Sequence, residues 1–567
     1  MTGPRFGTVA VLGVGTVGAV LVSRLARSGV RVIAVEADRG RATTAQQRVA
    51  DAGGTAAPVA YTSAIADAAA ADLVVEALPE RLPVKVQALR AAGGICRPDA
   101  VFATTTTGFS VAGIGVACDR LDRTVGLHPV EPGTVAGLVE VVATPVVDPA
   151  VLDSVALLAE QAGLITVRVP DRPGLLSGAL LMRYLNGAVN LLEQRYASRD
   201  DIDAAMRLGC GLRTGPLAQL DLVGLDVARD TLQALYERTG RRCFVPAPLL
   251  ATYVQAGMVG RKAGRGFYTY PEGPADPVIS PVAAGGEAPG RVAIVGSGTV
   301  ARGAAEACVR AGLPVVLLSR SAAGARQADE AIRRSLDSAV RRGRLAAERA
   351  AAALALLEVS AGLDRVGEAD LVLEAVPEDL AVKRAVFADL DKLARPGAVL
   401  ATGTSSLPVV ACARATVRPE DVLGIHFFHP VPAMRLAEVV RTPYTADRTV
   451  AVAGALCSAL GKRAVHCHDR AGFVVNALLL PYLNEAVGLL EQTYAADDID
   501  TVMRDGCGFP MGPLELLDMI GIDICLAVQH RLFEAFQEPD LRPAGLLEDL
   551  VRSGYLGRKS QRGFRAR

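Results

Sequence analysis

Two histidine–glutamate pairs have a spacing that suits proton transfer. His426 precedes Glu438 by 12 residues, and His128 precedes Glu140 by the same 12 residues. Histidine has an unperturbed pKa of about 6.5, so its neutral ring can take a proton from a hydroxyl group at neutral pH. A carboxylate on the next strand can accept a hydrogen bond from the far ring nitrogen, which fixes the tautomer and stabilises the imidazolium. Each pair could therefore act as the base when an alcohol is oxidised by hydride removal.

A glycine-rich turn upstream of the first pair suits the binding of a hydride acceptor. Gly13, Gly15 and Gly18 form a G-x-G-x-x-G motif between an expected strand and an expected helix. Such glycines allow a tight turn and let backbone N–H groups approach a pyrophosphate at the helix N-terminus. Glu36 ends the next expected strand, where its carboxylate can accept hydrogen bonds from ribose hydroxyls. This combination favours NAD in the first half of the chain.

The turn upstream of the second pair differs at the position that selects the nucleotide. Gly296, Gly298 and Ala301 repeat the motif, but Ser319 and Arg320 stand where the first half has its carboxylate. A carboxylate would repel a 2′-phosphate, whereas a hydroxyl with a guanidinium could hold one. The second half therefore leans toward NADP, with a relaxed preference as the alternative.

The two halves are copies of one unit. Residues 9–18 return as residues 292–301, and residues 72–80 return as residues 370–378. An internal repeat of this extent predicts that one folding unit occurs twice.

The elements that must position these residues alternate in a regular order. In residues 1–170, short apolar strands alternate with Ala-rich helices, which predicts a parallel, doubly wound α/β sheet of the Rossmann type. Residues 171–270 lack strands and predict an all-helical domain. Residues 271–290 are rich in Pro, Gly and Ala and predict a linker. Residues 291–468 and 469–567 repeat the α/β domain and the helical domain.

Composition narrows the class of protein. The 567 residues are 51% hydrophobic and carry a formal net charge of +0, so nothing favours a nucleic-acid partner. The N-terminus lacks a basic segment followed by a long apolar run, so we expect no signal peptide, no membrane span and a cytoplasmic location. The ten cysteines form no CxxC pair, and His466-Cys467-His468 lacks a second ligand pair. We therefore expect no metal site.

Several ordered motifs resemble one enzyme family. Residues 401–407, 424–439, 472–476, 481–486 and 512–518 together resemble the (S)-3-hydroxyacyl-CoA dehydrogenases of fatty-acid β-oxidation. The resemblance covers nearly the whole chain, twice. It implies a dinucleotide-binding domain followed by a helical C-terminal domain in each copy.

The resemblance also implies roles for individual residues. It makes His426 and Glu438 the catalytic pair, with Ser405 holding the reacting oxygen and Asn476 polarising the thioester side. Four further residues are implied to lie near the cofactor, two in each copy: Glu80, Lys85, Glu378 and Lys383.

Both copies depart from the family pattern. The family usually has Asn where the second copy has Gly403 and His429, so its substrate environment is not standard. The first copy changes more positions around its pair: Thr107 replaces Ser405, Glu131 replaces His429, Pro129-Val130 replaces Phe427-Phe428, and Gly178 replaces Asn476. The second copy also has 15 more residues between its second strand and residue 370. The resemblance implies that these residues form a helical hairpin over CoA, here residues 331–357.

We interpret the second copy as the main catalytic unit. The first copy is expected to bind a dinucleotide and to be either degenerate or directed to another substrate, because glycine cannot replace the hydrogen bonds of an amide. Retention of His128 and Glu140 argues for activity.

The expected function is NAD(P)-dependent interconversion of 3-hydroxyacyl and 3-oxoacyl thioesters, carried on CoA or on a carrier protein. One alternative is a biosynthetic ketoreductase for a carrier-bound or polyketide β-keto group. The other is a non-catalytic dinucleotide-binding scaffold or sensor. Because relatives dimerise through their helical domains, the two copies are expected to form an internal pseudo-dimer, with further homo-oligomers as an open alternative.

Overall fold

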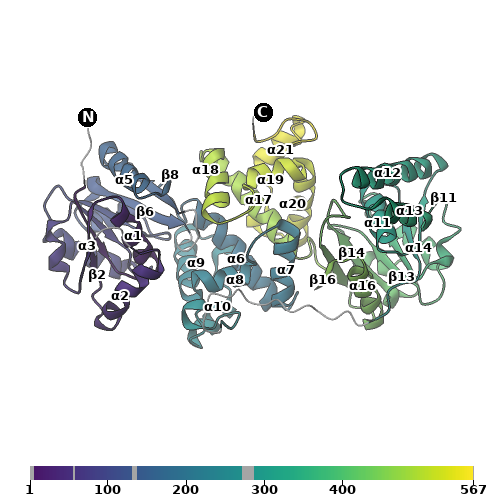
Figure 1. The fold of residues 1–567 in the computed structure, drawn as a ribbon, viewed down its shortest axis with the longest axis horizontal. Helices are drawn as coiled ribbons and strands as arrows, with labels where there is room; N and C mark the ends of the chain where they lie inside the picture. Colours follow the sequence, from purple (N-terminus) through teal and green to yellow (C-terminus); the bar gives the residue numbers. More distant parts are fainter. Residues whose placement is uncertain (1–5, 55–57, 131–136, 271–285, 566–567) are drawn as a thin grey trace.

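The computed structural model describes residues 6–565, except residues 55–57, 131–136 and 271–285. Two sheet domains lie at opposite ends of an elongated molecule, and two helical domains meet between them (Figure 1). The expected fold class, a Rossmann-type domain with a helical domain in duplicate, is confirmed. Most of the predicted linker lies outside the described residues.

The first sheet has eight strands in the order β3-β2-β1-β4-β5-β6-β7-β8. Their bounds are β1 (Thr8–Leu12), β2 (Arg31–Val35), β3 (Val59–Thr62), β4 (Leu73–Glu76), β5 (Val101–Thr104), β6 (Thr124–Val130), β7 (Leu138–Ala143) and β8 (Ile165–Pro170). All neighbours are parallel except β6 and β7, which pair antiparallel. The predicted parallel, doubly wound sheet is confirmed, and it includes one antiparallel pair, because the short connection between β6 and β7 leaves no room for a crossover helix.

The second sheet repeats this topology in the order β11-β10-β9-β12-β13-β14-β15-β16. Its strands are β9 (Val292–Val295), β10 (Val315–Ser319), β11 (Leu357–Ala361), β12 (Leu371–Glu374), β13 (Val399–Thr402), β14 (Val422–Phe427), β15 (Leu436–Arg441) and β16 (Arg463–His468). Here β14 and β15 form the antiparallel pair.

Helices cover both faces of each sheet. In the first domain they are α1 (Thr16–Arg27), α2 (Arg39–Asp51), α3 (Leu82–Gly93), α4 (Val111–Ala117) and α5 (Pro149–Gln161). Successive strand side chains point to opposite faces, so Val9 and Val11 pack with α1, α2 and α5, whereas Ala10 and Leu12 pack with α3 and α4. Burial on both faces explains the continuous apolar runs of the central strands.

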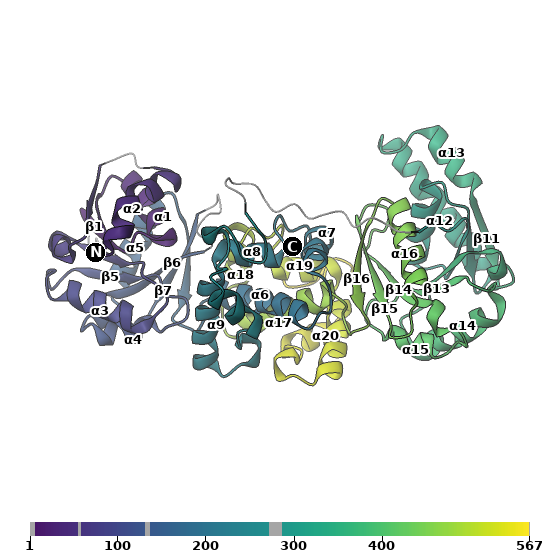
Figure 2. The same cartoon turned by 90° about the horizontal axis from the view of Figure 1, so that it is seen from below.

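The second sheet domain contains an additional helical hairpin. Its helices are α11 (Thr299–Arg310), α12 (Ala322–Arg341), α13 (Ala347–Ala355), α14 (Leu380–Leu393), α15 (Val409–Ala413) and α16 (Asp447–Ala459). Figure 2 shows α13 standing out from the end of the molecule. The hairpin begins before the predicted residue 331, because Ser321 caps α12 by accepting a hydrogen bond from the Gly324 amide at 3.1 Å.

The two helical domains share one hydrophobic core. The first contains α6 (Ser177–Glu193), α7 (Arg199–Cys210), α8 (Pro216–Val223), α9 (Leu225–Thr239) and α10 (Pro248–Gln255). The second contains α17 (Val475–Glu491), α18 (Ala496–Thr501), the π-helix η7 (Val502–Gly506), α19 (Pro513–Ile520), α20 (Ile522–Phe536) and α21 (Gly545–Arg552). Helix α6 packs on α17, while α7 reaches β16 and η7 reaches β7. Among the helices that the structure describes, none is long and apolar enough to span a membrane.

Candidate active site

The antiparallel strands bring each predicted catalytic pair together. His128 on β6 lies opposite Glu140 on β7, and His426 on β14 lies opposite Glu438 on β15. The ring Nδ1 lies 2.8 Å from the carboxylate in the first copy and 2.7 Å from it in the second. The histidine and the glutamate, 12 residues apart in sequence, therefore form a direct hydrogen bond in both copies. The other ring nitrogen, Nε2, remains available to face a substrate.

Both carboxylates are held by the start of a helix in the helical domain. Glu438 is fully buried and accepts hydrogen bonds from the amides of Val474 and Val475, at 3.0 and 2.9 Å. Glu140 is equally buried and accepts from the Leu176 and Ser177 amides, both at 2.9 Å. Backbone N–H groups at a helix start favour an anion. Each carboxylate thus fixes the histidine and also joins the sheet domain to the helical domain.

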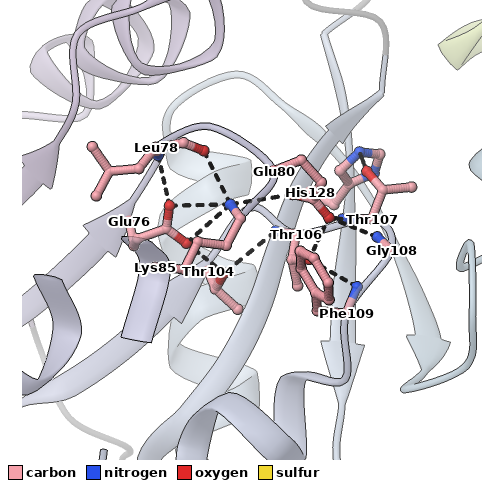
Figure 3. Close-up of polar contacts among 10 residues, drawn as sticks. All are labelled: Glu76, Leu78, Glu80, Lys85, Thr104, Thr106, Thr107, Gly108, Phe109 and His128. Carbon is pink, nitrogen blue, oxygen red and sulfur yellow. Dashed lines mark hydrogen bonds and ion pairs between the residues drawn. The ribbon is translucent and has the colours of Figure 1, made fainter. Parts of the chain in front are cut away.

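The residues around the histidine differ between the copies. In the first copy, the Thr107 hydroxyl lies 2.7 Å from His128 Nε2 (Figure 3). In the second, the Ser405 hydroxyl donates to Glu378 at 3.2 Å, and the Asn476 amide donates to the Ser405 carbonyl at 3.3 Å. The structure therefore brings Ser405 and Asn476 together beside the loop that follows β13.

Two substitutions of the first copy are sterically coupled. A Cβ atom built on Gly178 would lie 2.5 Å from the methyl group of Thr107. The methyl group of the threonine thus occupies space that a side chain at position 178 would need. Asn476 and Ser405 form one compatible pair, and Gly178 and Thr107 form the other.

Other substitutions lie outside this contact. In the second copy, the Phe428 ring packs on the His426 ring with centroids 4.5 Å apart. His429 is exposed beyond the end of β14. Glu131 of the first copy lies outside the described residues.

A buried lysine anchors the loop next to the histidine in the first copy. The Lys85 side chain, on α3, donates to Glu76 at 3.1 Å and to the Leu78 carbonyl at 3.1 Å (Figure 3). Its ammonium also lies 3.2 Å from the Glu80 carboxylate. Burial by itself would lower the pKa of Lys85, but the charges of Glu76 and Glu80 outweigh it and raise that pKa above its usual value.

Glu80 connects this lysine to the residues beside the histidine. Its carboxylate accepts from the Thr106 hydroxyl at 2.6 Å and from the Thr107 and Gly108 amides at 3.0 and 2.7 Å. Burial would raise the pKa of Glu80, but the Lys85 charge and these donors hold it below its usual value. The ionised carboxylate therefore positions the Thr107 hydroxyl relative to His128.

The second copy repeats this arrangement. Lys383, fully buried on α14, donates to Glu374 at 2.8 Å and lies 3.4 Å from Glu378. Glu378 accepts from the Thr404 hydroxyl at 2.6 Å and from the Ser405 amide at 3.0 Å. Burial opposes ionisation of Glu378, but the Thr404 hydrogen bond and the Lys383 charge lower its pKa.

Glu76 and Glu374, the fully buried partners of Lys85 and Lys383, had no predicted role. A signal for them was present. The spacing Glu76, Glu80, Lys85 recurs as Glu374, Glu378, Lys383. Because the spacing places a strand end, a loop and a helix in contact, it indicates a three-point ion network rather than three separate surface residues.

The glycine-rich turns have the geometry that a dinucleotide pyrophosphate needs. Gly13 has φ of 91°, and a Cβ on it would lie 2.8 Å from the Ala77 carbonyl. A Cβ on Gly18 would overlap the Gly13 carbonyl at 1.9 Å, so no side chain fits there. No atom lies within 4 Å of the corresponding point on Gly15, which leaves the approach to the N-terminus of α1 open.

The turn of the second copy has the same character. Gly296 has φ of 133°, and a Cβ on it would lie 2.4 Å from the Ala375 carbonyl. Gly298 is open like Gly15, and Ala301 is buried in α11. The residues present in both copies therefore fit a bound dinucleotide.

The positions at the end of the second strand differ between the copies. Glu36, at the end of β2, accepts a hydrogen bond from the Val14 amide at 3.1 Å, which directs its carboxylate toward the glycine-rich turn. In the second copy, Ser319 ends β10 and Arg320 is exposed directly after it. A Cβ on Gly324 would lie 2.5 Å from the Ser319 hydroxyl and 3.3 Å from that of Ser297.

Comparisons with known proteins agree with this geometry. The family model described as 3-hydroxyacyl-CoA dehydrogenase, NAD binding domain, matches residues 8–172 and 291–470. The model described as 3-hydroxyacyl-CoA dehydrogenase, C-terminal domain, matches residues 174–270 and 472–567.

Individual relatives match one copy in length. A 3-hydroxybutyryl-CoA dehydrogenase of Mycobacterium tuberculosis is 43% identical over 277 residues, which cover 48% of this chain and 97% of the relative. The human mitochondrial hydroxyacyl-coenzyme A dehydrogenase is 37% identical over 283 residues, covering 48% of this chain and 90% of the relative. The crystal structure of 3-hydroxybutyryl-CoA dehydrogenase from Escherichia coli K12 aligns with 97% of this chain and 100% of its own, with a TM-score of 0.64 and 23% identity, which shows a shared fold over both copies. The chain belongs to the 3-hydroxyacyl-CoA dehydrogenase family of oxidoreductases, and it carries the NAD-binding domain and the C-terminal domain of that family twice.

Proposed function

We propose that this protein interconverts 3-hydroxyacyl and 3-oxoacyl thioesters of CoA, with the second copy as the main catalytic unit. The observation that carries the proposal is the buried His426–Glu438 pair, 2.7 Å apart, in a domain that also holds a glycine-rich turn fit for a dinucleotide. A carrier-bound ketoreductase and a non-catalytic scaffold are not favoured, because the relatives are CoA dehydrogenases.

Each residue of the second copy has a defined task in this proposal. A dinucleotide held at the Gly296 and Gly298 turn would supply the hydride acceptor for C3 of the hydroxyacyl group. His426 Nε2 takes the proton of the C3 hydroxyl, and Glu438 stabilises the resulting imidazolium through Nδ1. The Ser405 hydroxyl, which donates to Glu378 in this structure, would turn to hold the reacting oxygen. The Asn476 amide, which donates one N–H to the Ser405 carbonyl, would use its other N–H to polarise the thioester carbonyl. In the reverse direction, His426 returns the proton.

Turnover of a short substrate tests the proposal directly. We expect the full chain to reduce acetoacetyl-CoA with a reduced nicotinamide dinucleotide. The reaction is measured as the decrease in absorbance of the reduced dinucleotide. Acetoacetyl groups on an acyl carrier protein provide the comparison, and we expect a lower kcat/KM for them. A complete lack of turnover with acetoacetyl-CoA and longer 3-oxoacyl-CoA esters would reject the proposed reaction.

The two copies are proposed to prefer different dinucleotides. Glu36 would accept hydrogen bonds from the ribose hydroxyls and repel a 2′-phosphate, so the first copy prefers NAD. Ser319, Ser297 and Arg320 offer hydroxyls and a guanidinium at the corresponding place, so the second copy leans toward NADP.

Substitution of Ser319 by Glu tests this preference. In a His128→Ala background, which isolates the second copy, we expect Ser319→Glu to lower the NADPH-to-NADH ratio of kcat/KM by about 10- to 100-fold. This is the range for losing a charged hydrogen bond of about 1.5–3 kcal/mol. Arg320→Ala should lower the same ratio by a smaller factor. If both ratios remain at the value of the background protein, neither residue selects the nucleotide.

Introducing an asparagine at position 178, the counterpart of Asn476, tests whether the missing side-chain amide makes the first copy the weaker unit. In a His426→Ala background, we expect Gly178→Asn alone to give no gain, because its side chain meets the Thr107 methyl group. Thr107→Ser combined with Gly178→Asn removes the methyl and should raise kcat/KM for acetoacetyl-CoA by about 10-fold or more over either single variant. Equal activities of the single and double variants would show that the missing amide does not limit the first copy.

A further inference from the structure

The interface between the helical domains contains unlike charges from the two copies. Arg183 on α6 and Arg241 after α9 belong to the first copy, whereas Glu485 on α17 and Asp540 after α20 belong to the second. Arg183 lies 2.5 Å from Glu485, and Arg241 contacts Glu485 with both terminal nitrogens, at 2.6 and 2.7 Å. Arg241 also donates to Asp540 at 2.8 Å. We call these four residues the charge cluster.

Three of the four residues of the charge cluster are largely removed from water, whereas Arg241 is 33% exposed. The side chains of Arg183 and Glu485 are 5% and 6% exposed, and that of Asp540 is 12% exposed. Burial alone would raise the pKa of Glu485, but the hydrogen bonds from Arg241 and the charge of Arg183 lower it below its usual value. Charges at this depth are tolerated only when they are paired.

Contacts around the cluster show that the copies are related by an approximate twofold axis. Arg172 donates to Gln492 at 3.0 Å, and its equivalent Arg470 donates to Gln194, the equivalent of Gln492, at 2.5 Å. Tyr184 packs against its own equivalent, Tyr482, with ring centroids 6.2 Å apart. These contacts would form equally well between two like copies.

The charge cluster does not follow this symmetry. Helices α6 and α17 both have 17 residues, so Arg183 corresponds to Pro481, and Glu485 corresponds to Gly187. Helices α9 and α20 both have 15 residues, so Arg241 corresponds to Glu538, and Asp540 corresponds to Cys243. Two first copies would therefore bury arginines opposite Gly187 and Cys243, and two second copies would bury carboxylates opposite Pro481 and Glu538.

A second ion pair at the edge of the interface is also one-sided. Arg463 on β16 lies 3.3 Å from Asp201 on α7. The equivalent positions are Ile165 and Asp498, which cannot form an ion pair.

From these observations we propose that the charge cluster restricts this interface to one partner, the unlike copy, and excludes pairing of like copies. Apolar packing and the symmetric contacts stabilise the interface. The buried charges make it specific for the unlike copy, because an interface between two like copies would leave every one of these charges without a counter-charge. This inference does not depend on the substrate or on which copy is catalytic.

Charge reversal in the full chain tests the proposal. One chain carries Arg183→Glu with Arg241→Glu, so both of its copies are acidic at the interface. The other carries Glu485→Arg with Asp540→Arg, so both of its copies are basic. Alone, each chain should lose its internal pairing and unfold at a lower temperature than wild type. Mixed in equal amounts, the two chains complement each other at both interfaces, and we expect a particle of twice the mass of wild type in sedimentation analysis.

The controls separate this outcome from a general effect of charge. Arg333→Glu with Arg334→Glu makes the same change of net charge on α12, where both arginines form exposed ion pairs, and should leave mass and unfolding temperature as in wild type. If the double-reversal chains precipitate, Arg241→Glu and Asp540→Arg alone provide the same test, because Arg241 is 33% exposed. Reversed chains that keep the wild-type unfolding temperature and do not combine on mixing would overturn the proposal.

Discussion

In a His128→Ala background, which isolates the second copy, replacement of His426 by Ala should reduce the turnover of acetoacetyl-CoA by about 10²- to 10⁴-fold, the usual contribution of a positioned general base. His426 Nδ1 is 2.7 Å from the fully buried Glu438 carboxylate. This hydrogen bond requires the tautomer with its proton on Nδ1, which leaves Nε2 as the base. Loss of the ring removes the acceptor for the C3 hydroxyl proton and leaves the Glu438 charge in place. The effect should therefore fall on kcat more than on KM.

His128→Ala is the matched control, because the first copy holds an equivalent pair at 2.8 Å. We expect it to remove the smaller share of turnover, since Gly178 replaces the amide there. Both variants should retain dinucleotide binding, as measured by fluorescence titration, because neither histidine belongs to a glycine-rich turn. Loss of turnover with His128→Ala alone would reverse the assignment of the two copies.

Replacement of Lys383 by Met should destabilise the second sheet domain by about 3–5 kcal/mol, the usual cost of breaking a buried ion pair. The lysine ammonium lies 2.8 Å from Glu374, whose side chain is fully buried on β12. Without the lysine, Glu374 keeps the Thr402 hydroxyl and the Val376 amide as donors but loses its counter-charge. Thermal unfolding, monitored by circular dichroism, should begin at a lower temperature than in wild type.

A paired substitution identifies the cause. Lys383→Met with Glu374→Gln removes both charges, and we expect it to recover most of the lost unfolding temperature. Lys85→Met in the first copy should have a similar cost, because Lys85 contacts Glu76 and Glu80 as Lys383 contacts Glu374 and Glu378. An unfolding temperature for Lys383→Met that equals wild type would contradict a stabilising role for the Lys383–Glu374 ion pair.

Much of the site could be predicted from sequence because it depends on local order. A glycine-rich turn between a strand and a helix requires only neighbouring residues, so Gly13 and Gly296 could be placed without tertiary information. Likewise, the pairing of His426 with Glu438 joins two strands that are adjacent in the chain. The internal repeat strengthened both predictions, since each motif occurs twice at matching positions.

Some features were decided only by packing between distant segments. Thr107 and Gly178 are 71 residues apart, and the clash that couples them depends on how the helical domain docks on the sheet. The antiparallel direction of β7 follows from its short connection, which the apolar pattern of the strand does not reveal.

The sequence by itself determined the family, the duplication and the identity of the hydrogen-bonded pair at each site, because these follow from residue type and short-range spacing. The tertiary structure alone decided which buried carboxylate neutralises which cation between the two copies. Arg183 and Glu485 are separated by 302 residues, and neither residue carries a sequence signal for the other. Their pairing follows from the docking of α6 on α17, where a buried charge must meet an opposite charge.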